Sequence, residues 1–231
     1  MLELKNLACG HNKNALLPAI TESIGPGKII FLVGKNGAGK TTLLKTLAGL
    51  LAPARGTVET KQRPIYLPAQ VSVADTLTGL DVQEIYGAGK SPLRWAPPVD
   101  RPFATLSSGE QRQILLSATL SHTSPVVLLD EPFNFLDWNH TLELIEAISA
   151  QAKTGRAFLL ATHHLDWILR FENTETWALV DTPEKNSRTI LKGKTHEVLV
   201  SEGFQAGFGV RIQILKNPGD AGHMLAISRR N

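Results

Sequence analysis

The chain has 231 residues with 42% hydrophobic and 19% charged side chains, enough to bury a sizeable core as one domain. Its formal charge of +3, without any long run of like charges, gives no reason to expect nucleic-acid binding, and its single cysteine, Cys9, excludes an internal disulfide. We expect a soluble or peripheral protein, because the N-terminus lacks a secretory signal and no apolar run approaches the roughly 20 residues that span a bilayer.

Short apolar runs separated by turn residues fill the first part of the chain. Leu2–Leu7 alternates apolar and polar residues and predicts a half-exposed strand, whereas the continuous apolar run 28–33 predicts a buried one. Helical spacing over 43–50 predicts a helix that Pro53–Gly56 ends. Further short strands are predicted over 15–23, 57–60 and 64–68.

The pattern changes between about residues 71 and 105. Val71–Leu77 and Asp81–Tyr86 each predict a short helix, and the proline-rich stretch that follows has no clear period. We therefore predict a small helical insert rather than a separately folded domain.

Strands and helices alternate through the rest of the chain. Helices are predicted over 107–120, 137–153, 166–171 and 197–201, and strands over 125–130, 156–161, 176–180, 189–191, 210–215 and 224–227. This alternation predicts an α/β domain with a largely parallel sheet.

A glycine-rich loop joins the buried strand at 28–33 to the helix that follows it. The loop fits the pattern G-x-x-x-x-G-K-[ST] with the residues Gly34, Lys35, Asn36, Gly37, Ala38, Gly39, Lys40, Thr41 and Thr42. Its backbone N–H groups and the helix N-terminus can surround phosphate oxygens. Lys40 adds a charge for the β- and γ-phosphates, and Thr41 offers a hydroxyl to Mg²⁺. The loop therefore predicts a nucleotide-phosphate site.

Two acids, Asp130 and Glu131, end the apolar strand predicted at 125–130. The carboxyl ends of parallel strands meet at one edge of a sheet, which is also where the glycine-rich loop lies. Asp130 can therefore reach the Mg²⁺ held by Thr41, and Glu131 can hold the water that attacks the γ-phosphate. The alternative is that the acids only cap the next helix.

The segment Leu106–Gln113 lies at a predicted helix start, where free N–H groups and serine hydroxyls form a second anion site. Taken alone, it is more simply explained as an N-cap, with Ser107 or Ser108 paired with Glu110 or Gln111. Its order and spacing relative to the other motifs favour the anion site.

The ordered set of motifs resembles the ATP-binding subunit of ABC transporters over nearly the whole chain. The motifs are the glycine-rich loop, Gln70, Leu106–Gln113, Val126–Pro132, Asn134–Asp137 and Leu159–His163. The resemblance implies a P-loop NTPase fold, with a RecA-like parallel-sheet core, an N-terminal antiparallel β part and a small helical subdomain. It places the ATP-binding core at 1–70 and 125–231 and the helical subdomain at 71–124, with Leu106–Gln113 as the family's signature motif.

The resemblance also implies roles for single residues. Gln70 would contact Mg²⁺ and relay the nucleotide state to the membrane subunit, and His163 would contact the γ-phosphate. Ser107 and Gly109 would bind the γ-phosphate held by a second copy, and Asp137 would lie at that dimer interface. Two subunits would then pair head to tail around two ATP molecules.

The chain departs from the family pattern at a few positions. His11 stands where an aromatic residue usually stacks on adenine, Ser108 where glycine is usual, and His164 where an aspartate usually follows the histidine. Since adjacent residues at a strand end point to opposite sides, we do not expect His163 and His164 to share a metal ion.

The stretch 71–77 and the tail, Glu197–Leu199 followed by Phe208–Ile212, resemble the importers of iron chelates, haem and cobalamin. This resemblance implies an ATPase on the cytoplasmic face of the inner membrane, with ATP, Mg²⁺, a separate membrane permease and a second copy of itself as partners. A soluble ABC ATPase of a protein-assembly complex, such as one for iron–sulfur clusters, is the alternative. A DNA-maintenance ABC ATPase is disfavoured, because no heptad run lies between Lys40 and Ser107.

Overall fold

The computed structural model describes residues 1–11, 14–86, 89–95, 97–182, 187–216 and 223–229. At some edges of these ranges, His11 among them, only the backbone is described. No helix within these ranges is long and apolar enough to cross a membrane.

A mixed sheet forms the centre of the described part of the molecule. Its strands are β5 (Ile29–Gly34), β7 (Ile65–Leu67), β8 (Val126–Asp130), β9 (Ala157–Ala161), β10 (Glu175–Thr182) and β11 (Ser187–Lys194). They lie in the order β11-β10-β5-β9-β8-β7, and every neighbouring pair is parallel except β10 and β11. The prediction of a largely parallel sheet is confirmed.

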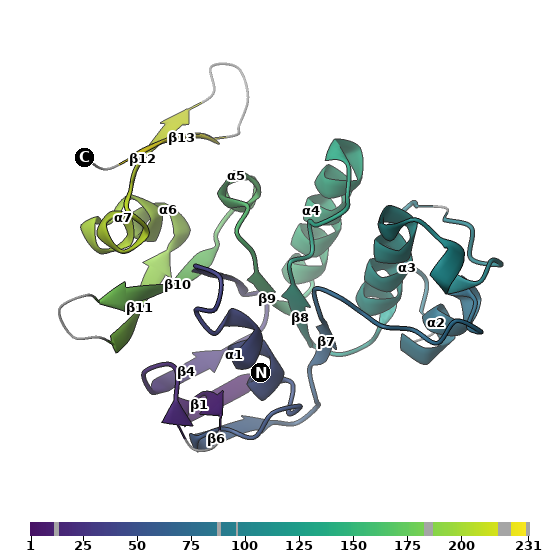
Figure 1. Cartoon of the computed structure of the whole chain (residues 1–231), viewed down its shortest axis with the longest axis horizontal. Coiled ribbons are helices and arrows are strands. Elements are labelled where there is room, and N and C mark those ends of the chain that lie inside the picture. Colours follow the sequence, from purple (N-terminus) through teal and green to yellow (C-terminus); the bar gives the residue numbers. More distant parts are fainter. Residues whose placement is uncertain (12–13, 87–88, 96, 183–186, 217–222, 230–231) are drawn as a thin grey trace.

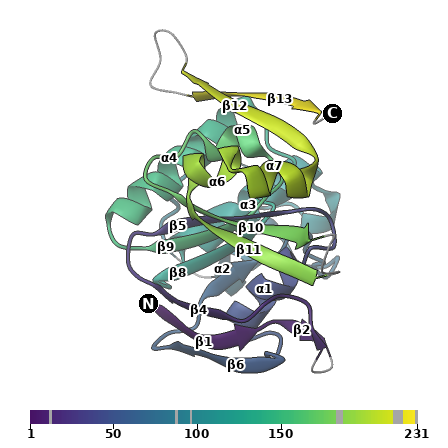
Figure 2. The ribbon, with the colours of Figure 1, turned by 90° about the vertical axis from the view of Figure 1, so that its left-hand side faces the viewer.

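Three smaller antiparallel units complete the β structure. The first joins β4 (Ile20–Ile24), β1 (Leu2–Ala8) and β6 (Arg55–Thr60) in the order β4-β1-β6. The other two are the hairpins β2 (Gly10–His11) with β3 (Asn14–Ala15), and β12 (Val210–Lys216) with β13 (His223–Arg229). The antiparallel N-terminal part is therefore confirmed, and it lies at the opposite end of the molecule from the C-terminal hairpin (Figure 2).

The helices are α1 (Lys40–Leu47), α2 (Gly79–Tyr86), α3 (Ser108–Ser121), α4 (Trp138–Lys153), α5 (Leu165–Ile168), α6 (Thr195–Val200) and α7 (Glu202–Phe208), with a 3-10 turn over Phe103–Thr105. Figure 1 shows α1 between the central sheet and the strands β1, β4 and β6, and it shows α2 with α3 at one end of the molecule. The boundaries of the predicted helical subdomain, 71–124, stay a prediction.

Two apolar layers cover the two faces of the central sheet, because successive strand residues point to opposite sides. Phe31 of β5 and Leu129 of β8 belong to the layer packed by α3 and α4. Leu32 and Leu128, one residue away on the same strands, belong to the layer packed by α1 and the N-terminal sheet. Full burial of each such side chain contributes roughly 1.5–3 kcal/mol. The packed strands β5 and β8 lead directly into the glycine-rich loop and to Glu131.

The structure corrects two predicted elements. Val71–Leu77 is not a helix; the chain there is irregular, and α2 begins only after Thr78, whose hydroxyl and N–H both donate to Asp81 at 2.7 Å. The single tail helix predicted at 197–201 is two helices, because Ser201 ends α6 and its hydroxyl caps α7 by accepting from the Phe204 N–H at 3.3 Å.

Candidate functional site

The glycine-rich loop connects β5 to α1, as its pattern predicted. Gly37 and Gly39 have φ of 76° and 100°, a conformation that other residues rarely adopt. This lets the loop turn back so that α1 begins at Lys40 with its N-terminus toward the loop. The Lys40 ammonium donates to the Gly34 carbonyl at 2.7 Å, and burial lowers its pKa.

A cavity of about 510 Å³ lies over this loop. Its lining residues are Leu16, Asn36, Gly37, Ala38, Gly39, Lys40, Thr41, Thr42, Ala69, Asp130 and Glu131. The cavity thus brings together the predicted phosphate loop and both predicted acids, which lie far apart in the sequence. Gly34, at the end of β5, and Gln70, an exposed residue beside Ala69, lie outside this lining.

Thr41 and Asp130 meet inside the cavity. The Thr41 hydroxyl donates to Asp130 Oδ2 at 2.7 Å, and the Tyr66 hydroxyl donates to the same oxygen at 3.4 Å. Burial raises the pKa of Asp130, although the Thr41 hydrogen bond opposes the shift. A hydroxyl and a carboxylate, both presenting hard oxygen atoms, fit the ligand preference of Mg²⁺. Tyr66 was missed at the sequence level, where it was one apolar-looking residue of a short strand.

Glu131 follows β8 in a strained backbone conformation, with φ of 48°. Its N–H donates to the Ala161 carbonyl at 2.8 Å, which ties it to the end of the neighbouring strand β9. His163 Nδ1 donates to Glu131 Oε2 at 2.9 Å, and the Glu131 side chain is only 14% exposed. The carboxylate that was expected to hold the attacking water is therefore oriented by the histidine that was expected to contact the γ-phosphate.

The expectation that His163 and His164 point apart is wrong. Their ring centroids lie 4.0 Å apart with an interplanar angle of 35°. The reason is that β9 ends at Ala161 and the chain bends at His163, so the alternation of an extended strand no longer applies. His164 Nε2 donates to Asn134 Oδ1 at 3.2 Å, and burial lowers the pKa of His164.

Arg112 is a buried link that the sequence analysis did not assign. From α3 it reaches the backbone around the carboxyl end of β8, donating to the carbonyls of Asp130 at 2.9 Å, Glu131 at 2.8 Å and Pro68 at 3.0 Å. The residue is 3% exposed, and burial lowers its pKa to about 10. An arginine among the apolar positions of the predicted helix was the one available signal.

Ser107 caps α3, and both halves of a capping box are present. The Glu110 N–H donates to Ser107 Oγ at 3.3 Å, while the Ser107 N–H and hydroxyl each donate to Glu110 Oε2 at 2.8 Å. The simpler N-cap explanation is thus correct for the local structure, and it leaves the predicted anion-binding role open. Ser108 is the first residue of α3 and is not among the residues with positive φ.

Gly109 lies close to the segment that leads from Phe135 to Asp137. A side chain at Gly109 would approach the Phe135 carbonyl to 3.1 Å, so α3 packs closely against the segment that leads to Asp137. Asp137 caps α4 by accepting from the His140 N–H at 2.8 Å, the main cause of its lowered pKa. Ser107, Gly109 and Asp137 are not among the described residues that line the cavity. The side chain of His11 lies outside the described residues, so its predicted contact with adenine stays a prediction.

Comparison with known proteins gives matches along the whole chain. The family model described as ABC transporter matches residues 17–80, and a model described as AAA domain, putative AbiEii toxin, Type IV TA system, matches residues 99–166. The hemin import ATP-binding protein HmuV of Nitrobacter winogradskyi is 31% identical over 205 residues, which cover 74% of this chain and 76% of that protein. The iron(3+)-hydroxamate import ATP-binding protein FhuC of Bacillus subtilis is 26% identical over 94% of this chain and 91% of that protein.

The fold matches that of a solved transporter structure described as an inward-facing conformation of a putative metal-chelate type ABC transporter. The TM-score is 0.78 at 21% identity, covering 100% of this chain and 97% of the other. The phosphate loop and paired acids of the present chain, together with its relatives, lead to one conclusion: this chain belongs to the ATP-binding proteins of the ABC transporter family and is an ATPase.

Proposed function

We propose that this ATPase powers an importer for an iron chelate, haem or cobalamin, acting through a separate permease at the cytoplasmic face of the inner membrane. The observation that carries the proposal is the likeness over most of the chain to proteins named for hemin and iron(3+)-hydroxamate import. A cobalamin import ATP-binding protein of Halobacterium salinarum is also 29% identical over 88% of this chain. These relatives favour an importer over a protein-assembly ATPase.

The proposed chemistry is the attack of water on the γ-phosphorus of ATP, which breaks the bond to the ADP leaving group. The loop N–H groups and Lys40 bind the phosphates, and Thr41, Asp130 and Gln70 would hold Mg²⁺. Bound Mg²⁺ supplies neutralisation of the phosphate charge. Glu131 accepts the proton of the attacking water, and the hydrogen bond from His163 keeps the carboxylate aimed at that water.

The complete site would need a second copy of the chain. Ser107 and Gly109 stand at the N-terminus of α3, a 14-residue helix whose first turn favours negative charge, yet they do not line the phosphate-loop cavity. This separation supports a head-to-tail pair in which the signature segment of each copy covers the γ-phosphate bound by the other. Asp137 would then lie at the interface.

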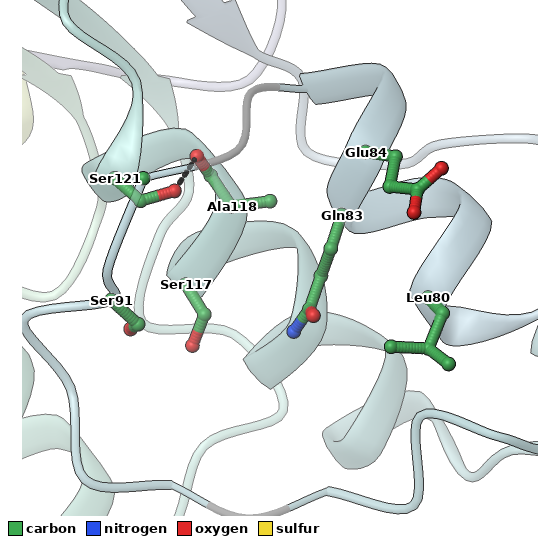
Figure 3. A pocket seen from close by; sticks show the side chains of 8 residues that line it. Leu80, Gln83, Glu84, Ser91, Ser117, Ala118 and Ser121 are labelled. Atoms are coloured by element: carbon green, nitrogen blue, oxygen red, sulfur yellow. Dashed lines mark hydrogen bonds between the residues drawn. The ribbon is translucent and has the colours of Figure 1, made fainter.

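The permease would dock on the helical insert. Leu80 and Ile85 of α2 are 48% and 66% exposed, which is unusual for two large apolar side chains on one short helix. Leu80 borders a pocket of about 240 Å³ between α2 and α3, which Gln83, Glu84, Ser117 and Ser121 also line. In Figure 3 the Gln83 side chain is directed toward Ser117, whereas the Glu84 side chain points away. The two exposed apolar side chains on α2, one of them beside this pocket, support contact with a protein segment.

The proposal is tested by purifying the chain from its native membrane together with whatever permease it binds. The complex is reconstituted into vesicles and supplied with haem, a ferric hydroxamate or cobalamin, and ATP-dependent uptake of each is measured. Uptake of one of these compounds, abolished by Glu131→Gln, is the expected result. Association only with export proteins or with soluble assembly proteins would contradict the importer proposal.

A further inference from the structure

His163 and His164, together with Glu131, form a cluster of side chains that can bind a metal ion, a capacity that the proposed hydrolysis of ATP does not use. One ring nitrogen of each histidine and one carboxylate oxygen of Glu131 all lie within 4.8 Å of one another. Two imidazoles and a carboxylate are a ligand set that Zn²⁺ and related transition-metal ions prefer, whereas Mg²⁺ prefers oxygen ligands alone.

The cluster is built by the sheet and does not depend on one flexible loop. β8 and β9 are parallel neighbours, and Asp130 pairs with Ala161 at their carboxyl ends. Glu131 therefore follows one strand end and the two histidines follow the adjacent one. The Glu131 N–H bond to the Ala161 carbonyl at 2.8 Å fixes the two ends together.

The hydrogen bonds of the two rings suit metal binding. His163 Nδ1 donates to Glu131 Oε2 at 2.9 Å, and a metal ion can bind between the same two atoms when the neutral ring carries its proton on Nε2 instead. Asn134 Oδ1 accepts from His164 Nε2 at 3.2 Å, so the other ring nitrogen of His164 keeps its lone pair. Asn134 thus has the orienting role that second-shell partners of zinc-binding histidines have.

We propose that Glu131, His163 and His164 form a binding site for a divalent transition-metal ion such as Zn²⁺, and that its occupation stops ATP hydrolysis. The ion binds a carboxylate oxygen of Glu131, which lowers the ability of this group to accept the proton of the attacking water, and it also removes the His163 hydrogen bond that orients the carboxylate. With three protein ligands, a fourth position stays open for water or a phosphate oxygen. The inhibitory half rests on the proposed roles of Glu131 and His163 in hydrolysis.

Metal binding is measured first, without nucleotide, so that the result does not depend on ATPase activity. Untagged, chelator-treated chain is titrated with Co²⁺, whose visible absorption reports its ligands, and Zn²⁺ is then added to displace it. The variants are His164→Asn and, as a matched control, His196→Asn on α6, which removes an exposed histidine elsewhere. Matching thermal unfolding curves ensure that the variants are compared as folded proteins.

The wild type and His196→Asn should bind one Co²⁺ that Zn²⁺ displaces, and His164→Asn should bind it roughly tenfold more weakly or worse, since even second-shell changes cost that much. Absence of binding in the wild type overturns the proposal. So does equal binding by His164→Asn, because an ion held by Thr41 and Asp130 would not respond to this variant.

The second measurement is the ATPase rate at saturating Mg²⁺-ATP over a range of buffered free Zn²⁺. Each variant is compared with its own rate without Zn²⁺. Inhibition should need at least tenfold more Zn²⁺ in His164→Asn than in His196→Asn. If the ATPase rate does not change at Zn²⁺ concentrations at which the Co²⁺ titration shows the site to be filled, the inhibitory role is overturned. If the chain has no ATPase activity at all, the proposed function fails while the Co²⁺ titration still decides the metal site.

Discussion

At the scale of single residues, the proposed hydrolysis depends most on the position of Glu131, the proposed base. Its backbone is held by the Ala161 carbonyl and its side chain by His163, while its own carbonyl accepts from Arg112 at 2.8 Å. A residue with φ of 48° persists only where its surroundings hold it. These contacts hold Glu131 at the lining of the cavity over the phosphate loop.

Replacing Glu131 with glutamine tests its role as the base. The amide keeps the shape of the side chain but cannot accept a proton from water, so turnover should fall roughly 10²–10⁴-fold. Nucleotide affinity should stay close to that of the wild type, because the phosphate loop is unchanged. Steady-state hydrolysis and equilibrium nucleotide binding are the two measurements. Hydrolysis at the wild-type rate would show that another group is the base.

Arg112 is expected to matter for stability as well as for the site. Arg112→Ala leaves three carbonyls without this donor, and each such loss costs about 1–3 kcal/mol, so the free energy of unfolding should drop by at least about 3 kcal/mol. Arg63→Ala, at an exposed position, is the control and should change it by less than about 0.5 kcal/mol. Denaturant unfolding measures both variants. Equal losses would mean that the buried bonds contribute nothing.

The sequence predicted those site residues whose signal is local. The phosphate loop, Asp130 and Glu131 each belong to a short pattern next to a strand, and that pattern specifies the local backbone. Tyr66 and Arg112 carry no such pattern, because their roles arise only when segments distant in the sequence meet. The end of β9 at Ala161 was predicted correctly, but the side-to-side alternation of a strand was wrongly extended to His163 and His164, which lie beyond that end where the chain bends.

At the scale of elements, the capping box of α3 makes the stability of the fold depend on the charge of Glu110. The carboxylate of Glu110 accepts from the Ser107 N–H and hydroxyl, and these bonds, the backbone one first, lower its pKa below the ordinary 4.5. A carboxylate with a lowered pKa in the folded state stabilises the fold at pH values above its unfolded pKa. That contribution is lost as the pH falls through the lowered value.

Glu110→Gln isolates this effect, because glutamine can form the same capping box without a charge. The wild type should lose stability relative to the variant as the pH falls from above 4.5 into the acid range, and the difference should be constant at neutral pH and above. The free energies of unfolding of both proteins are measured in denaturant across this range. A pH-independent difference would mean that the carboxylate is not stabilised in the fold.

The helix α7 depends on a close approach to β10. A Cβ at Gly207 would lie 2.5 Å from Val180 Cγ1, an atom of a stiff side chain in a buried strand. Gly207→Ala should therefore destabilise the fold by about 1–3 kcal/mol, against the usual preference for alanine in a helix. Gly203→Ala in the same helix is the control, because its Cβ would meet only the flexible end of Leu191 at 3.1 Å.

Thermal or denaturant unfolding of the two glycine variants separates packing from helix propensity. If both variants are stabilised, α7 does not pack on β10 as described. The same two glycines explain why α7 was absent from the predicted elements, since glycine lowers helix propensity and only tertiary contact makes it favourable here. Long, strongly patterned elements such as β5, β8 and α4 carried enough local signal to be predicted near their observed bounds.

At the scale of the whole molecule, the binding groups for one nucleotide are divided. The phosphate loop and both acids line one cavity, while the signature segment Leu106–Gln113, which leads into the first turns of α3, contributes no described residue to that lining. Such an arrangement is incomplete in a single chain if the signature segment binds phosphate. The proposed head-to-tail pair resolves this, and it makes binding of ATP the event that joins two copies.

The most direct test is sedimentation velocity on the Glu131→Gln variant, in which bound ATP persists, with and without saturating Mg²⁺-ATP. We predict a monomer without nucleotide and a dimer with it. Adding Ser107→Arg, which places a bulky cation where the neighbouring γ-phosphate would bind, should be compared in the same run. The account predicts that this double variant still binds ATP but stays monomeric; a monomer of Glu131→Gln at saturating ATP, or a dimer indifferent to Ser107→Arg, would contradict it.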